Sequence, residues 1–236
     1  MYLLSIGKVI HHTALTIDSI ELCELTKGFQ LDAYDYIIIN GGDGSIRRVM
    51  KTLQGFQNLP PFILNPTGSF NVIAKLHRVP KMDTVLQALS QKKIPETSPQ
   101  LVYVLNQEVF LFSAGNMGDL QHIFLSETLR FGILEKGITK YLLSAFFLFP
   151  LHLVMTPFML ISKRRFFIFT PLSFIKKLGS FYGEVNEMTI DLKNEHNMLE
   201  LDGDIVIIEA SILQIKPHNT VHIVSTLEKE NSYKLK

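Results

Sequence analysis

Two patterns of hydrophobic and polar positions alternate along the first 95 residues. Tyr36–Asn40 is a short apolar run without polar alternation, which predicts a strand buried on both faces. Ile46–Leu53 instead spaces its apolar residues as one face of a helix. The pattern then repeats, with a strand at Phe62–Leu64 and helices at Asn71–Leu76 and Met82–Leu89. Repeated strand–turn–helix units predict an α/β domain with a mostly parallel sheet covered by helices.

The residue composition of the chain changes at Lys92–Gln100, where two prolines and several polar residues predict a linker. The runs that follow are rich in β-branched and aromatic residues and are separated by turn residues. We therefore predict two domains: an α/β domain over 1–95 and a β-rich, β-sandwich-like domain over 96–236. The second domain is predicted to contain a helical insertion at about 119–160.

Inside that insertion, residues 141–162 carry no charge and are followed by Lys163, Arg164 and Arg165. The length suits a membrane span, but Pro150 and Pro157 interrupt it. A buried core helix, a hairpin that dips into a membrane surface and a true span all stay open. Basic residues continue among aromatic ones up to Lys177, so 140–177 is the candidate membrane-surface region.

Composition and charge narrow the class of protein. The net charge of +1 gives no support for nucleic-acid binding. The single cysteine, Cys23, rules out an internal disulfide framework and fits a reducing compartment. The first residues, MYLLSIGKVIHH, lack the apolar core and cleavage site of a secretory signal, so we expect a cytoplasmic protein.

Two glycine-containing turns each follow a predicted strand and precede a predicted helix. The first is Gly41-Gly42-Asp43-Gly44-Ser45, and the second is Pro66-Thr67-Gly68-Ser69 followed by Asn71. Glycine lets another group approach the backbone, and N–H groups at a helix start can hold phosphate. An aspartate beside phosphates would be repelled by their charge unless both bind a shared Mg²⁺ ion. For the first turn taken alone, the alternative is an ordinary tight turn in which the aspartate caps the helix. Consecutive units in a parallel sheet place both turns at one edge, where they can line one crevice.

These two motifs, with Leu201-Asp202-Gly203-Asp204 near the end of the chain, resemble a known family. The catalytic domains of diacylglycerol kinases, sphingosine kinases and bacterial lipid kinases carry GGDGT, then P-x-G-T-x-N-D-x-A, then D-G-E, in the same order. NAD kinases share the first motif and a related first domain, but their second motif fits PTGSFNVIA less well.

The resemblance implies transfer of the γ-phosphoryl group of ATP, with Mg²⁺, to a lipid hydroxyl. It implies that Asp43 organises Mg²⁺, that Asp202 accepts the proton of the attacking hydroxyl, and that Asp204 supports it, which makes these three the catalytic residues. The cofactor-binding residues implied in the same way are Gly41, Gly42, Gly44, Ser45, Thr67, Gly68, Ser69 and Asn71. The expected partners are a lipid substrate and the inner face of a membrane, where the protein would be peripheral; the acceptor lipid is not specified, and a homodimer stays open.

The sequence also departs from the family pattern. Arg47 and Arg48 stand where the family has Asn-Glu, and we expect at least one of them to face solvent. Phe70 replaces a small residue, and Val72 replaces an aspartate of the acidic network around the metal. Asp119 is our candidate for a replacement carboxylate and metal ligand. The departures, which include Ser45 for threonine and Asp204 for glutamate, support a second hypothesis: a catalytically weak relative that binds nucleotide or lipid at a membrane surface. NAD kinase-like or other phosphotransfer is a third.

Overall fold

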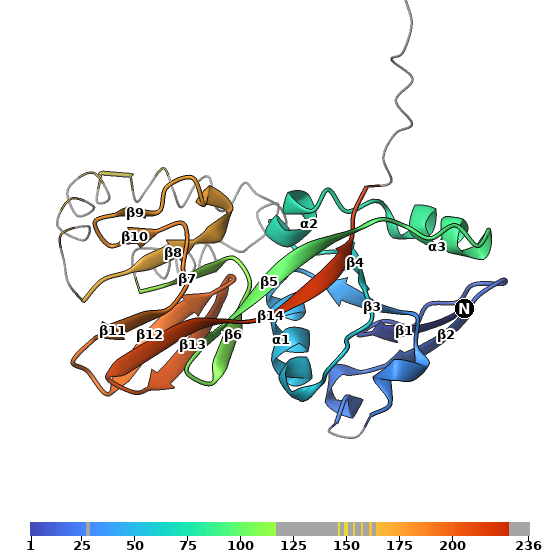
Figure 1. Ribbon diagram of the computed structural model, residues 1–236, viewed down its shortest axis with the longest axis horizontal. Helices are drawn as coiled ribbons and strands as arrows, with labels where there is room; N and C mark the ends of the chain where they lie inside the picture. The colour runs from blue at the N-terminus through green and yellow to red at the C-terminus, as the bar shows by residue number, and fades with distance from the viewer. Residues whose placement is uncertain are drawn as a thin grey trace, which may run out of the picture. The chain divides into compact units, whose positions relative to one another are not determined.

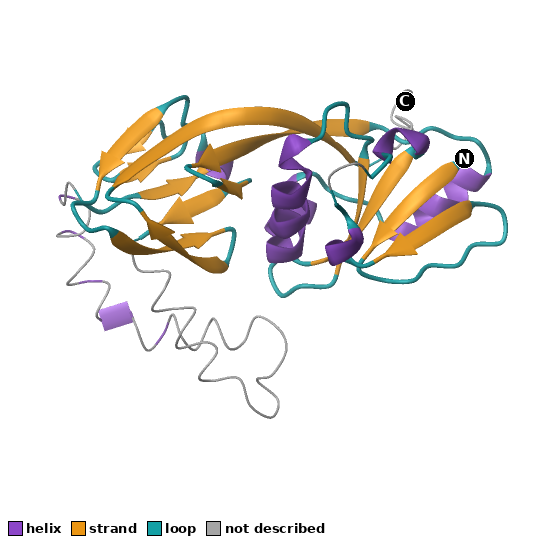
Figure 2. Ribbon diagram, turned by 90° about the horizontal axis from the view of Figure 1, so that it is seen from below, coloured by secondary structure: helices purple, strands orange, loops and turns teal. Residues whose placement is uncertain are grey.

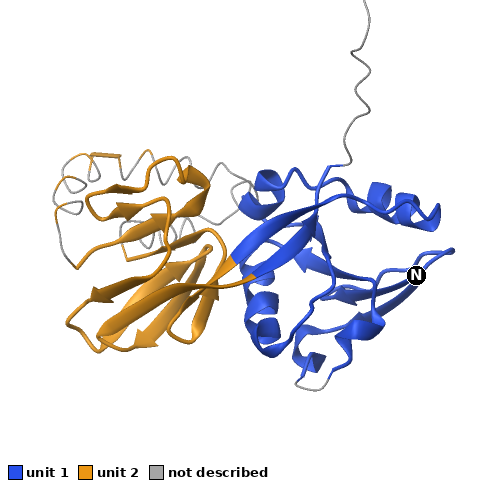
Figure 3. Ribbon diagram, in the orientation of Figure 1, with its two compact units in different colours: residues 1–101, 220–236 blue, residues 102–219 orange. Residues whose placement is uncertain are grey.

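The computed structural model describes residues 1–26, 29–116 and 164–226, together with the single positions 146, 149, 150, 153, 157 and 161. The predicted helical insertion at 119–160, the question of whether 141–162 enters a bilayer, and Asp119 therefore lie wholly or largely outside the described residues. The chain forms two compact units, one of Met1–Leu101 with Thr220–Lys236 and one of Val102–Asn219 (Figure 3).

The first unit is built on a mostly parallel sheet. Its strands follow the order β2-β1-β3-β4-β14-β5. Their bounds are β1 Tyr2–Ile6, β2 Thr16–Ile20, β3 Tyr36–Gly41, β4 Phe62–Pro66, β5 Thr97–Leu105 and β14 Ile212–Val224. Strand β1 pairs in parallel with β2 and β3, and β4 pairs in parallel with β3 and β14. Ile37, Ile38 and Ile39 are at most 1% exposed, which confirms that β3 is buried on both faces.

Three helices alternate with these strands (Figures 1 and 2): α1 Asp43–Thr52, α2 Val72–Leu76 and α3 Met82–Ser90. Short 3₁₀ turns occur at Leu22–Glu24, Leu31–Ala33 and Leu53–Gly55. The predicted apolar face of α1 is buried through Ile46, Val49 and Met50. One face of α3 is buried in a cluster with Leu3, Ile38 and Ile63 of the sheet. This alternation confirms the predicted α/β class.

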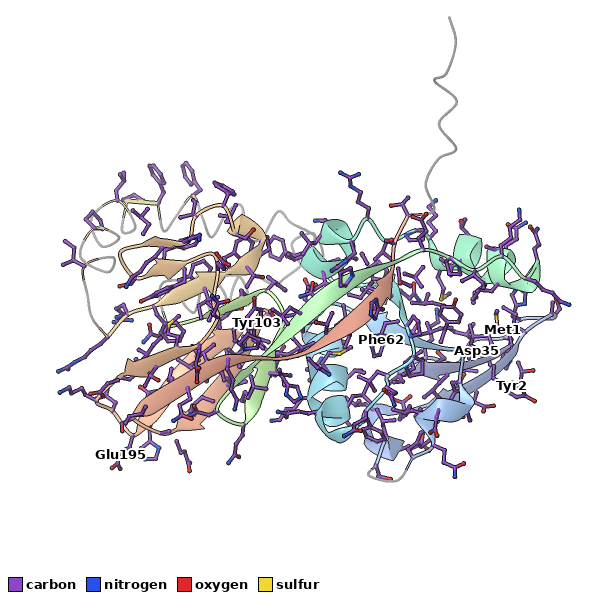
Figure 4. All side chains as sticks on the ribbon, in the orientation of Figure 1. Met1, Tyr2, Asp35, Phe62, Tyr103 and Glu195 are labelled. Atoms are coloured by element: carbon purple, nitrogen blue, oxygen red, sulfur yellow. The ribbon has the colours of Figure 1, made fainter. Side chains whose placement is uncertain are left out.

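The second unit is rich in β-structure, as predicted. Strands in the order β13-β12-β7-β8-β10-β9 form one sheet, while β11 pairs with β14 and β6 pairs with β5 in the sheet that also contains β1 to β4. Their bounds are β6 Glu108–Phe110, β7 Ser113–Gly115, β8 Phe167–Phe169, β9 Lys177–Leu178, β10 Phe181–Tyr182, β11 Met188–Asp191, β12 His196–Leu201 and β13 Asp204–Glu209, with a 3₁₀ turn at Thr170–Leu172. Tyr103 of β5, labelled in Figure 4, stacks on Phe110 of β6 with ring centroids 5.0 Å apart.

Strand β14 makes the compact units differ from the predicted ranges 1–95 and 96–236. It is 13 residues long, and its residues up to Asn219 belong to the second unit. Its last residues return to the first unit, where Ile223 pairs with Phe62 of β4. Val221, Ile223 and Val224 are buried at this end of β14, and Val224 belongs to the hydrophobic core cluster of the first unit.

In the part of the chain that the structure describes, no helix is both long and apolar enough to cross a bilayer.

Candidate functional site

Three turns lie at the carboxyl ends of adjacent parallel strands in the first unit. Strand β3 ends at Gly41, which is paired in register with Pro66 at the end of β4, so the two predicted turns are neighbours as expected. Strand β1 pairs with the other side of β3 and ends at Ile6. Gly7 follows with a φ of +82°, which favours glycine. Sequence reasoning could not align this third turn with any motif.

A ladder of polar side chains connects the strand ends beneath the turns. Asn65 Nδ2 donates to Asn40 Oδ1 at 2.8 Å, and Asn40 Nδ2 donates to Ser5 Oγ and to the Ile6 carbonyl, both at 3.0 Å. Ser5 Oγ donates in turn to the carbonyl of Lys8 at 2.6 Å. Sequence analysis missed this ladder, although its signal was present as an asparagine at the end of each of two apolar runs. The ladder fixes the three turns in register.

The two glycine turns pack backbone against backbone. A Cβ atom on Gly68 would lie 2.7 Å from the Cα atom of Gly42, and one on Gly42 would lie 3.0 Å from the Cα atom of Gly68. The Thr67 N–H also donates to the carbonyl of Gly41 at 3.1 Å. Gly41 itself has a φ of +148°, and a Cβ atom there would clash with the Ser45 side chain. Glycine is therefore required because one turn closely approaches the other.

Asp43 joins the two turns through hydrogen bonds. It stands in the first turn of α1, yet its carboxylate accepts the first two backbone N–H groups of α2, from Val72 at 2.8 Å and from Ile73 at 3.0 Å. Burial raises the pKa of the Asp43 carboxyl above its ordinary value, while the two N–H groups and the charge of Lys75 offset part of that rise. Asp43 is thus a helix cap, but for the following helix and not for its own.

The second turn is closed by Asn71, whose φ of +48° is in the left-handed region. Its side chain accepts the Gly68 N–H at 3.0 Å and donates to the Gly68 carbonyl at 2.7 Å. Thr67 and Ser69 are exposed, so their hydroxyl groups can reach a ligand. Phe70 is 37% exposed at the end of the same turn.

The amino end of α1 carries no side-chain cap, because its N-cap residue is Gly42. The first N–H groups of a helix lack intrahelical partners and carry partial positive charge, so such an end attracts anions. Arg48 is exposed, with Nη2 at 3.4 Å from Ser45 Oγ, whereas Arg47 is 5% exposed. This confirms that one of the two arginines faces solvent.

In the second unit, Asp202 and Gly203 form the two-residue turn between β12 and β13, where Leu201 pairs with Asp204. Their φ values of +50° and +86° are those of a type I′ turn, in which Asp-Gly is favoured. Asp202 is only 2% exposed. Its carboxylate accepts the backbone N–H groups of Leu111 at 2.6 Å and of Phe112 and Ser113 at 2.9 Å each.

A second buried carboxylate, Glu200, reinforces this turn and was not singled out from the sequence. Glu200 is 4% exposed, and its Oε1 accepts the Ser113 hydroxyl at 2.9 Å and the Gly203 N–H. Asp204 is half-buried. Of the two aspartates in the D-G-D segment, Asp204 is therefore the more accessible, whereas Asp202 ties the hairpin to residues 111–113.

The described residues fit a magnesium ion only in part. Within the described ranges, His, Cys, Asp and Glu side chains form no group of three that could hold a metal ion, and Asp119 lies outside those ranges. Each carboxylate oxygen of Asp43 accepts one backbone N–H hydrogen bond and keeps a further lone pair. Since Mg²⁺ often takes one or two carboxylates and completes its shell with substrate phosphates and water, Asp43 can serve as such a ligand.

Comparison with known proteins found one matching family model and a set of similar solved structures. Residues 7–99 match the model of the diacylglycerol kinase catalytic domain. A diacylglycerol kinase structure from Bacillus anthracis str. Sterne is 15% identical with a TM-score of 0.53, and the match covers 95% of this chain and 96% of that chain. An NAD kinase from Archaeoglobus fulgidus in complex with ATP is 12% identical with a TM-score of 0.45, over 98% of this chain and 95% of that chain. No curated protein sequence matches the chain. At 15% identity, the similarity to the Bacillus anthracis structure shows a shared fold.

Proposed function

We propose that this chain, whose residues 7–99 match the model of the diacylglycerol kinase catalytic domain, is an ATP- and Mg²⁺-dependent lipid kinase. It would transfer the γ-phosphoryl group to a lipid hydroxyl. The observation that carries the proposal is the backbone contact between Gly42 and Gly68 beside the uncapped amino end of α1. The absence of side chains at Gly42 and Gly68 lets a polyphosphate approach the backbone at the amino end of α1.

The nucleotide would lie along the turns that follow β3 and β4. Its phosphates would accept N–H bonds from the 41–45 segment, where Gly44 and Ser45 belong to the first turn of α1. The exposed hydroxyls of Thr67 and Ser69 would contact the ribose or the phosphates. Asn71 would act indirectly, because its side chain holds the Gly68 backbone in place.

Asp43 would hold Mg²⁺ through the lone pairs that its two helix-capping bonds leave available. The bound ion would neutralise charge on the phosphates during transfer. The same carboxylate keeps α2 attached to the first turn, so Asp43 would position both the metal and the second glycine turn.

The proton of the attacking hydroxyl would go to the D-G-D turn of the second unit. Asp202 is the carboxylate that the family pattern puts in this role, but three N–H donors occupy it and it is 2% exposed. Asp204 is half-buried on the first residue of β13. We therefore propose that Asp202 positions the turn. The transfer assay below compares Asp202 and Asp204 as the proton acceptor.

The acceptor would be reached at the inner surface of a membrane by a cytoplasmic, peripheral protein. Phe174 and Leu178 are 79% and 61% exposed among the lysines at 176 and 177. Exposed apolar side chains next to cations suit an anionic lipid–water boundary. These positions fall within or beside the candidate membrane-surface region 140–177.

The test is transfer of radiolabelled γ-phosphate from ATP into a lipid extract in the presence of Mg²⁺. The parent should yield a labelled lipid whose chromatographic class identifies the acceptor. Asp43→Asn should abolish the product, and Asp204→Asn and Asp202→Asn should rank the two candidate proton acceptors. Asp83→Asn, on an exposed aspartate at the start of α3, is the matched control and should retain activity.

A second candidate function is a nucleotide- or lipid-binding module with little transfer activity. It is favoured by the occupied oxygens of Asp43 and by the burial of Asp202. A folded parent that binds ATP but gives no labelled lipid would support this module and exclude the kinase. Product that depends on Asp43 would exclude the module.

A further inference from the structure

The second unit contains a cavity of about 750 Å³ that is lined by none of the residues assigned to ATP, to Mg²⁺ or to the D-G-D turn. Three separate segments form its wall: the chain just before β8, strands β9 and β10 with their connecting turn, and the end of β11. Among the residues that the structure describes, the charged lining is Arg164, Arg165, Lys177 and Lys193 with one carboxylate, Asp191. This excess of positive charge among the described lining residues favours a negatively charged ligand.

Asn116 fixes the wall that carries the two arginines. Asn116 Nδ2 donates to the Arg164 carbonyl at 2.9 Å, and Asn116 Oδ1 accepts the Phe166 N–H at 3.0 Å. Arg165 Nη1 also donates to the Asn116 carbonyl at 2.8 Å. The backbone between positions 164 and 166 is therefore held on both sides of Arg165. Guanidinium groups on such a preorganised wall suit the paired oxygens of a phosphate.

The two lysines of the cavity are also held by contacts within the unit. Lys177 Nζ lies 5.1 Å from the centroid of the Tyr182 ring, in the range of a cation–π contact. Lys193 Nζ lies 3.9 Å from Asp191 Oδ2. Strand β10 pairs with both β8 and β9, which joins Lys177 and Tyr182 to the segment that follows the arginines (Figure 1).

Exposed apolar side chains adjoin this charged cavity. Ile161 lines it and is 80% exposed, and Leu178, between the lining residues Lys177 and Gly179, is 61% exposed. A soluble anion makes no favourable contact with apolar side chains beside its site, whereas a phospholipid presents acyl chains beside its phosphate.

We infer that this cavity binds the headgroup phosphate of an anionic phospholipid at a membrane surface. The cations of the cavity would contact the phosphate, and Leu178 and Ile161 would contact the outer acyl region. The site uses none of the residues assigned to ATP or to the D-G-D turn, so binding does not require phosphoryl transfer.

The test is flotation of the full chain with phosphatidylcholine vesicles, with and without phosphatidylglycerol, at physiological salt. The parent should bind the anionic vesicles more tightly than the neutral ones. Lys177→Gln and Lys193→Gln should each weaken binding about fivefold, as expected for one cation near an anionic surface. Lys216→Gln is the matched control, since Lys216 is an exposed residue of the same unit, does not line the cavity, and changes net charge equally.

Equal losses in all three variants would mean general surface attraction and would overturn the cavity site. Equal binding of the parent to both kinds of vesicle would also overturn it. Glycerol phosphate and inorganic phosphate are the soluble competitors. Release from vesicles by micromolar concentrations of either would show a site for free phosphate instead of a lipid. Because the readout is vesicle binding, each of these failures leaves the phosphoryl-transfer proposal to be judged by its own assay.

Discussion

Replacing Gly68 by alanine adds one methyl group where the two glycine turns touch. The new Cβ atom would lie 2.7 Å from the Cα atom of Gly42 and 2.9 Å from Asn71 Oδ1, closer than real Cβ atoms approach other heavy atoms. The φ of Gly68 is not in the left-handed region, so the cost comes from space and not from backbone strain. The Asn71 oxygen already accepts the Gly68 N–H, and Gly42 is the N-cap residue of α1, so neither neighbour moves freely.

Overpacking of this kind typically costs about 1–3 kcal/mol. Gly68 is exposed, which lets the second turn shift outward, so we expect the lower half of this range for the free energy of unfolding. The same shift moves the hydroxyls of Thr67 and Ser69 away from the N–H groups of 41–45 that would hold the phosphates. A misplacement worth about 1.4 kcal/mol in binding weakens ATP affinity roughly tenfold.

Urea unfolding and calorimetric titration with ATP measure the two effects. Gly55→Ala is the matched control, because a Cβ atom on Gly55 would meet nothing within 4 Å. The control should unfold and bind ATP as the parent does. If Gly68→Ala behaves like Gly55→Ala in both measurements, the contact between the turns does not matter and the argument from glycine packing is refuted.

Three other predictions concern carboxylates and the second turn. Asp202→Asn should lower the free energy of unfolding by about 2–3 kcal/mol, since an amide cannot satisfy three N–H donors. Asp204→Asn should lower it by less than about 1 kcal/mol. The reverse order in urea unfolding would contradict the anchoring role of Asp202. Asn71→Ala should be less stable than Asn71→Gly by about 1 kcal/mol, because only glycine accepts a φ of +48° at no cost, and equal stabilities would rule out this strain. The raised pKa of Asp43 means that the folded state binds its proton more tightly, so the stability that Asp43 contributes should fall as pH rises above about 4 and level off above the folded pKa. Asp43→Asn should lack this slope in paired urea titrations, and the same slope in both proteins would disprove it.

The fold class could be predicted because its signals are local. The apolar run at 36–40 has no polar alternation, and it is short and rich in isoleucine, which is typical of a strand buried on both faces; β3 is such a strand. The α1 face was readable from its helical spacing, and the glycines after each strand marked the turns. The division between the compact units was less readable, because no local pattern shows that the end of β14 pairs with β4.

The candidate site was predicted by residue type but not by the role of each residue. The sequence indicated that Gly42, Asp43 and Gly68 matter, and it assigned them to phosphate and metal. The structure adds that Gly42 and Gly68 contact each other and that Asp43 caps α2. The Asn40–Asn65 ladder escaped notice because pairing across neighbouring strands depends on register, which periodicity within one strand does not specify.

By itself, the sequence determined where strands, helices and tight turns form, since these follow from side-chain periodicity and from the conformational freedom of glycine over a few residues. Only the tertiary structure decided what each turn faces. Asp202 illustrates this: its Asp-Gly pair predicts a hairpin turn, but its carboxylate is buried against residues 111–113, which are distant in sequence. The energetic role of a buried carboxylate depends on the donors that surround it, and those donors are brought together only when the chain folds.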